Sequence, residues 1–149
     1  MFNRTLLGLA LLPLLSVALA QSTPSTTPAL SRAESYISGR LTVPAGVNLR
    51  HIFVAACAET DPMCMGGIVR VVPLSGEDRV AKAGGEQIRY TLPDLPAGRY
   101  SLWALNDLNG NLMHDMDTEE MGALLTPDQK PVLIKLGTTT ADFALFPIK

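Results

Sequence analysis

The chain has 149 residues, which is long enough for one domain with its own hydrophobic core. Its 12 basic and 14 acidic residues give a formal net charge of −2, and the positive charges are scattered singly. The sequence therefore has none of the clustered basic surface that binds nucleic acids or anionic membranes, and these partners are excluded.

The first 20 residues have the pattern of a secretory signal peptide. Arg4 supplies the positive start, residues 5–17 form an apolar stretch, and Ala18-Leu19-Ala20 fits a small-residue cleavage site. The apolar stretch is shorter than the ~20 residues of a membrane-spanning helix, so cleavage after Ala20 is preferred over retention as an anchor. We therefore predict a secreted or periplasmic protein with no membrane span after cleavage.

Residues 21–35 are rich in Ser, Thr and Pro, and they contain too few apolar side chains to offset the entropy cost of ordering. They are predicted to form a flexible tether. The folded domain is predicted to span residues 36–149.

Short apolar segments separated by turn residues fill this domain. Residues 37–43 alternate apolar and polar side chains, which is typical of a half-buried strand, whereas residues 51–58 form a continuous apolar run typical of a central strand. The predicted strands are 37–43, 51–58, 68–74, 87–92, 99–105, 132–136 and 141–146. No segment carries a helical apolar stripe. The pattern predicts an all-β fold, an antiparallel seven-stranded, Ig-like β-sandwich.

The two cysteines, Cys57 and Cys64, are predicted to form a disulfide. An exported chain enters an oxidising compartment, where paired cysteines join. Their spacing is not the CxxC of redox motifs, and no histidine pattern completes a zinc site. Closing so short a loop contributes roughly 2–3 kcal/mol.

Residues 107–120 carry oxygen-bearing side chains at alternate positions, as Ca²⁺-binding loops do. The predicted metal ligands are Asp107, Asn109, Asn111, Asp115 and Asp117, with the backbone carbonyl of Met113. Leu112 replaces the glycine of an EF-hand and Thr118 replaces its last glutamate, so we predict a calcium site on a sandwich edge loop and not an EF-hand. The alternative is an ordinary polar turn, because Asn-Gly favours tight turns and Asn and Asp cap their own backbones.

Methionines gather near the same loop and near the cysteines. The residues concerned are Met63, Met65, Met113, His114, Met116 and Met121. Thioether and imidazole groups suit copper, so the alternative function is a periplasmic metal-binding protein with copper or calcium as its cargo. The competing interpretation is that these methionines fill the core.

Residues 87–107 contain the pattern strand, Leu-Pro-Ala-Gly-x-Tyr, strand, D-x-N-x-N. This pattern resembles prealbumin-like (transthyretin-like or carboxypeptidase regulatory-like) secreted β-sandwich domains, and residues 137–145 resemble the last strand of that fold. The resemblance implies a folding, spacing or recognition module without an active site. In the turn itself, Pro96 and Gly98 supply the backbone angles, and Tyr100 is predicted to pack across the sandwich.

No catalytic motif is recognisable. The chain has neither a nucleophile elbow nor a glycine-rich phosphate loop, and its only histidines are His51 and His114. We predict an exported non-catalytic structural or binding module of the cell envelope, stabilised by calcium in the 107–120 loop. Its predicted partner is a protein or glycan, and the sequence leaves its oligomeric state open.

Overall fold

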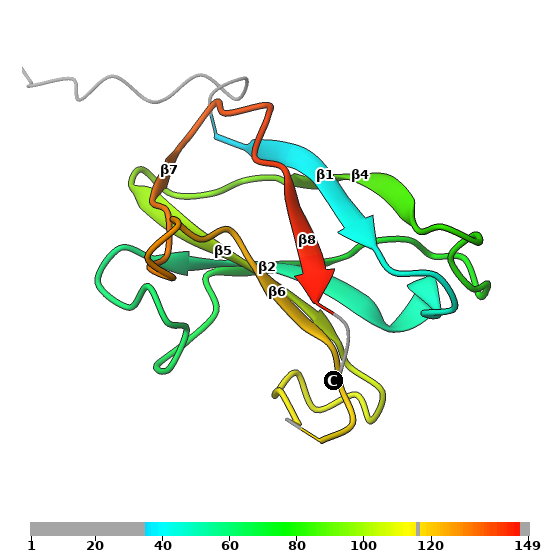
Figure 1. The fold of residues 1–149 in the computed structure, drawn as a ribbon. Coiled ribbons are helices and arrows are strands. Elements are labelled where there is room, and N and C mark those ends of the chain that lie inside the picture. Colours follow the sequence, from blue (N-terminus) through cyan, green and yellow to red (C-terminus); the bar gives the residue numbers. More distant parts are fainter. Residues whose placement is uncertain (1–34, 116, 147–149) are drawn as a thin grey trace, which may run out of the picture.

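The computed structural model describes residues 35–115 and 117–146 and consists of β-strands joined by turns and loops (Figure 1). The strands are β1 (Ile37–Val43), β2 (Ile52–Ala58), β3 (Arg70–Pro73), β4 (Glu86–Leu92), β5 (Arg99–Asn106), β6 (Met121–Ala123), β7 (Ile134–Lys135) and β8 (Phe143–Phe146), with one 3-10 turn, η2 (Leu49–His51). The predicted all-β class is confirmed. The predicted signal peptide and residues 21–34 of the predicted tether lie outside the described residues. In the described part, no helix is long and apolar enough to cross a membrane.

The strands form one hydrogen-bonded sheet in the order β3-β2-β5-β6-β8-β1-β4, and β7 pairs with β5. Every pair is antiparallel except β1 with β8, which run parallel. The prediction of seven antiparallel strands is therefore wrong in two details, because β6 is an eighth strand and one pair is parallel. Parallel neighbours need a long connection, and β1 and β8 have most of the domain between them.

This sheet folds over into two layers around a common core. The layer containing β4, β1 and β8 lies over the layer containing β3, β2, β5 and β6 (Figure 1). Strand β4 also packs against β2 and β3, which brings the two ends of the strand order together. The arrangement is that of a β-sandwich, as the strand pattern predicts.

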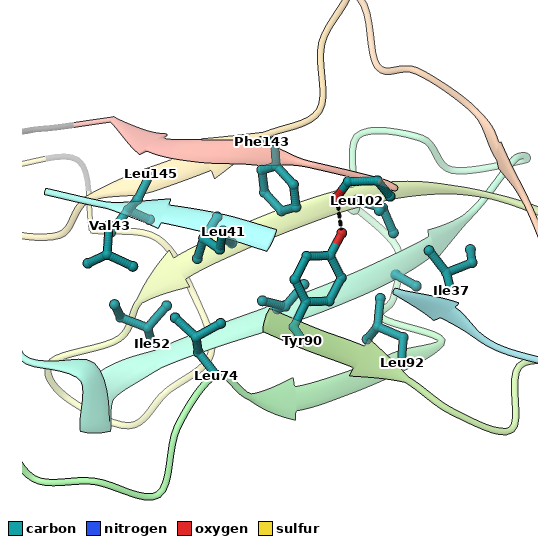
Figure 2. Packing of buried hydrophobic residues seen from close by; sticks show 14 of the residues in the cluster. Ile37, Leu41, Val43, Ile52, Leu74, Tyr90, Leu92, Leu102, Phe143 and Leu145 are labelled. Atoms are coloured by element: carbon teal, nitrogen blue, oxygen red, sulfur yellow. Dashed lines mark hydrogen bonds between the residues drawn. The ribbon is translucent and has the colours of Figure 1, made fainter. Parts of the chain in front are cut away.

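Period-two alternation decides which side chains enter the core. Ile37, Gly39, Leu41 and Val43 of β1 are buried, and the residues that alternate with them are partly or fully exposed. Figure 2 shows these side chains meeting those of the facing layer. Tyr90 stands edge-on to Phe143, with ring centroids 5.9 Å apart and planes at 79°. Packing of aromatic and branched side chains from both layers therefore supplies the main stabilisation of the fold.

The Tyr90 hydroxyl donates a hydrogen bond to the backbone oxygen of Ala141, which is drawn as a dashed line in Figure 2. Burial raises the pKa of this hydroxyl above its ordinary value of 10.0, so Tyr90 keeps its proton, and its role as a donor, well into the alkaline range. The bond joins β4 to the segment that leads into β8.

The turn between β4 and β5 places Tyr100 in the core, as expected. Its hydroxyl donates to the backbone oxygen of Pro96 at 2.5 Å. The expected role of Gly98 is wrong, because the left-handed backbone angle of this turn belongs to Asp94, with φ of 52°. Aspartate tolerates this conformation better than most residues, so the glycine is not needed for it.

Candidate functional site

Asp107, the first predicted metal ligand, is a buried carboxylate at the end of β5. Its backbone N–H donates to the carbonyl of His51 at 2.8 Å. The side-chain Oδ1 accepts from the amides of Gly110 at 2.8 Å and Asn111 at 3.1 Å, and Oδ2 accepts from the amide of Leu112 at 3.0 Å. Both oxygens therefore face backbone donors, and the carboxylate organises the loop from within.

Leu112 occupies the loop position that would be glycine in an EF-hand. Its φ is 55°, in the left-handed region that a leucine rarely adopts. The hydrogen bond from its amide to Asp107 stabilises this conformation. The chain therefore makes the sharp turn of such loops without the glycine, which the sequence pattern did not indicate.

Glu119 closes the loop from its other end. This buried carboxylate accepts from the amide of Leu108 at 2.8 Å and from the amide of Asp115 at 3.0 Å, one bond to each oxygen. Sequence reasoning assigned Glu119 no role, because it falls one residue after the last position of a calcium loop. Its signal in the sequence was the acidic pair Glu119-Glu120 directly before β6, and only the folded loop shows which amides Glu119 accepts from.

The remaining predicted ligands lie at the loop surface. The side-chain amide of Asn109 donates to Asp115 at 2.6 Å, and the side-chain oxygen of Asn111 accepts from the amide of Met113 at 2.7 Å. Asp117 is exposed. Within residues 35–115 and 117–146, no group of three or more His, Cys, Asp or Glu side chains is placed to hold a metal ion. The structure thus brings Asn109 and Asp115 together and directs Asp107 toward the backbone.

The loop between β2 and β3 is closed by the predicted disulfide, since Cys57 and Cys64 are bonded. Cys57 is buried at the end of β2, and Cys64 takes a left-handed φ of 57°. For a loop of this length, closure lowers the entropy of the unfolded chain by the equivalent of about 2.5 kcal/mol. The bridge therefore fixes the two residues on either side of Cys64, Met63 and Met65.

Asp61 and Trp103 hold the same loop in place. The Asp61 carboxylate accepts from the amides of Met65 at 3.0 Å, Gly66 at 2.5 Å and Gly67 at 3.2 Å. These bonds, first that from Gly66 and then that from Met65, favour the charged form and lower the Asp61 pKa below its ordinary value of 3.8. The indole N–H of Trp103 donates to the Pro62 carbonyl at 3.0 Å, which joins the loop to β5.

A hollow of about 770 Å³ lies between this loop and the 107–120 loop, and we refer to it as the hollow. Its floor is the face of β2, β3, β5 and β6 that points away from the core. Its lining consists of Phe53, Ala55, Met63, Cys64, Met65, Gly66, Gly67, Ile68, Val71, Trp103, Ala104, Leu105, Leu112, Met113, His114 and Met121. Both loops extend from the sheet on the side away from β1 and β8 (Figure 1). No charged carboxylate, lysine or arginine side chain belongs to the lining.

Three of the methionines in the hollow are exposed to solvent. The exposed fractions are 53% for Met63, 87% for Met65 and 68% for Met113. The core-filling interpretation of these three methionines is therefore wrong. Exposed thioethers have few packing partners, so they remain free to contact a ligand.

His114 lies at the edge of the hollow with one ring nitrogen engaged. Its Nε2 is 2.9 Å from the backbone oxygen of Glu119. A carbonyl oxygen only accepts hydrogen bonds, so Nε2 carries the proton and donates. In the neutral ring Nδ1 then carries the free lone pair, and within the described residues no side chain or amide bonds to it.

Trp103 also lines the hollow, a position that was not predicted from the sequence. The sequence contains one sign of this position, because β5 is apolar on both faces. Leu102 and Ala104 are buried, and Trp103 and Leu105 face outward. A strand that is apolar on both faces has both faces covered. Here the second face is covered only by two loops.

Comparisons with protein-family models, with curated proteins and with solved structures found no match to this chain. The resemblance to prealbumin-like domains therefore stays a prediction from the residues at 87–107 and 137–145.

Proposed function

We propose that this chain is an exported, non-catalytic binding module of the cell envelope and that the hollow is its binding surface. The observation that carries the proposal is an open, uncharged hollow of about 770 Å³ lined by exposed methionines and the only tryptophan of the chain. Sites for small ligands fall in the range of about 300–1,000 Å³ and are mostly apolar with a few polar groups. His114 is the polar group of this one.

The composition of the lining favours a ligand with apolar or polarisable surface over a glycan. Flexible, polarisable methionine side chains adapt to ligands of different shapes and are frequent at binding surfaces. Ile68 and Leu112 add further exposed apolar area at the rim. A continuous exposed apolar patch marks an interaction site in a soluble protein.

Export is supported by two independent features. The first 20 residues have the charge and hydropathy pattern of a signal peptide. The Cys57–Cys64 disulfide is of the kind that persists in oxidising compartments outside the cytosol. A protein or glycan of the envelope remains the proposed class of partner, with the apolar lining favouring a protein.

The binding surface is tested with a neutral apolar dye, N-phenyl-1-naphthylamine, added to the mature protein. We expect the dye fluorescence to rise and the emission of Trp103 to change, because this tryptophan lines the hollow. The variant Met113→Glu places a charge in the hollow and should abolish both signals. The control is Val80→Glu, which changes an apolar residue with 57% exposure that lies outside the lining. Equal dye binding by the two variants would refute the proposal.

Calcium in the 107–120 loop was predicted from the sequence, and we infer from the geometry of Asp107 that the loop is stable without it. Asp107 already accepts three backbone hydrogen bonds, which occupy most of the about four acceptor sites of a carboxylate and hold the turn together without a cation. We therefore expect equal melting temperatures for the mature protein in millimolar Ca²⁺ and in EGTA. A Ca²⁺-dependent rise that disappears in Asp115→Ala would instead establish an ion site, because a ligand of the folded state raises its stability.

A further inference from the structure

We infer that the hollow is a site for a soft monovalent metal ion, Cu(I). The inference rests on the proposed function, since it names one ligand of the same surface. All four methionines that the structure describes, Met63, Met65, Met113 and Met121, line the hollow. They come from three separate segments, the β2–β3 loop, the 107–120 loop and β6, so folding alone brings them together.

The chemistry of this donor set selects the metal. Thioether sulfur is a soft, neutral ligand that favours Cu(I), whereas Ca²⁺ and Mg²⁺ need oxygen ligands and Zn²⁺ prefers thiolate or several imidazoles. The lining contains four thioethers and one imidazole but no carboxylate. A site without negative charge also favours a monovalent ion, because desolvating a divalent ion there costs more.

The disulfide restricts the sulfur ligands to thioethers. Cys64 lines the hollow, but its sulfur is bonded to that of Cys57, and no free cysteine exists among the described residues. A blue-copper centre, which needs a cysteine thiolate and two histidines, is thereby excluded. The same bridge fixes the loop that carries Met63 and Met65.

His114 has the arrangement of a metal-binding histidine. Such residues donate the proton of one ring nitrogen to a backbone carbonyl or carboxylate, which orients the ring and leaves the other nitrogen for the metal. The bond from Nε2 to the Glu119 carbonyl is of this kind. Glu119 is itself fixed by the amides of Leu108 and Asp115, so the acceptor is held in place. The free Nδ1 is then the nitrogen ligand.

Trp103 gives the site an optical reporter. It lines the same hollow, and its indole N–H is engaged by the Pro62 carbonyl. Tryptophan is the strongest aromatic partner for a cation, and it interacts within about 6 Å of the ring centroid. Because it is the only tryptophan of the chain, any metal-dependent change of tryptophan emission originates here.

The test is an anaerobic titration of the mature, disulfide-bonded protein with Cu(I), in competition with a bathocuproine chelator, and a parallel titration with Ag(I). We expect one ion per chain and quenching of Trp103 emission with either metal. The variant Met63→Leu/Met113→Leu should lose binding, and His114→Ala should bind at least about tenfold more weakly. His51→Ala is the matched control, since His51 does not line the hollow, and it should bind as the unaltered chain does.

The apolar dye separates failure of this inference from failure of the proposed function. Leucine keeps the hollow apolar, so Met63→Leu/Met113→Leu should still bind the dye, which also demonstrates that the variant is folded. Dye binding without Cu(I) or Ag(I) binding would overturn the metal site and leave the binding surface standing. Metal binding that survives the methionine substitutions would place the ion elsewhere and overturn the inference as well. Absence of both metal and dye binding would refute both.

Discussion

Replacing Gly39 by alanine is expected to destabilise the domain by about 3 kcal/mol or more, the upper end of what overpacking costs. A Cβ at this position would lie 2.1 Å from the backbone oxygen of Ala141 and 2.5 Å from its carbonyl carbon. Neither atom can move away easily, because the Ala141 amide donates to the Ser38 carbonyl at 3.1 Å and its oxygen accepts from Tyr90. The methyl group would therefore separate β1 from the segment that enters β8.

The measurement is urea unfolding of the mature domain, compared with Gly76→Ala. Gly76 has no atom within 4 Å of an added Cβ and no left-handed φ, so alanine there should be neutral or stabilise by up to about 1 kcal/mol. If Gly39→Ala were as stable as Gly76→Ala, the close approach of the two segments would not exist in solution.

The strands with clear alternation or long apolar runs were predictable, and those defined by their neighbours were not. The predicted strand at residues 37–43 coincides with β1, because the residues that become buried alternate with polar ones in its sequence. Strand β6 was missed, since its three residues include Gly122 and show no period. An added Cβ at Gly122 would lie 2.3 Å from the Ala144 oxygen, so the glycine permits β6 to approach β8. That reason exists only in the folded chain.

The candidate site was also predictable from the sequence only in part. The sequence located the polar loop at residues 107–120, but alternation of oxygen-bearing residues fits an ion and a self-bonded turn equally well. What the folded chain adds is the direction of the Asp107 oxygens, which point to the amides of residues 110–112. Spacing along a chain does not encode that direction.

The sequence did not predict that the loops after β2 and β5 line a common hollow. Ile52 pairs with Asn106 and Ala58 with Tyr100, so the loop after β2 and the loop after β5 leave from opposite ends of the same strand pair. Both nevertheless line one hollow over the outer face of these strands. The methionines are recognisable in the sequence, but their common position in the hollow follows from the strand register and the course of the loops.

Replacing Asp107 by alanine is expected to cost about 3 kcal/mol, since hydrogen bonds to a buried charged group contribute about 1.5–3 kcal/mol and this buried carboxylate accepts three of them. The substitution leaves the amides of Gly110 and Leu112 without their acceptor, and the amide of Asn111 keeps only its bond to the Asn109 side-chain oxygen at 3.0 Å. The left-handed turn at Leu112 then loses the carboxylate that holds it. The variant Asp107→Asn keeps one side-chain oxygen as an acceptor, so its stability should lie between those of the unaltered domain and of Asp107→Ala.

The matched control is Asp115→Ala, which removes an exposed carboxylate from the same loop and leaves the Asp115 amide bonded to Glu119. Urea unfolding should place this variant within about 1 kcal/mol of the unaltered domain, as is usual for exposed polar pairs. Equal losses for Asp107→Ala and Asp115→Ala would contradict the organising role of the buried carboxylate. Because Leu112 and Met113 line the hollow, loosening this turn should also weaken binding of the apolar dye. The stability of the polar loop and the shape of the apolar surface therefore depend on the same carboxylate.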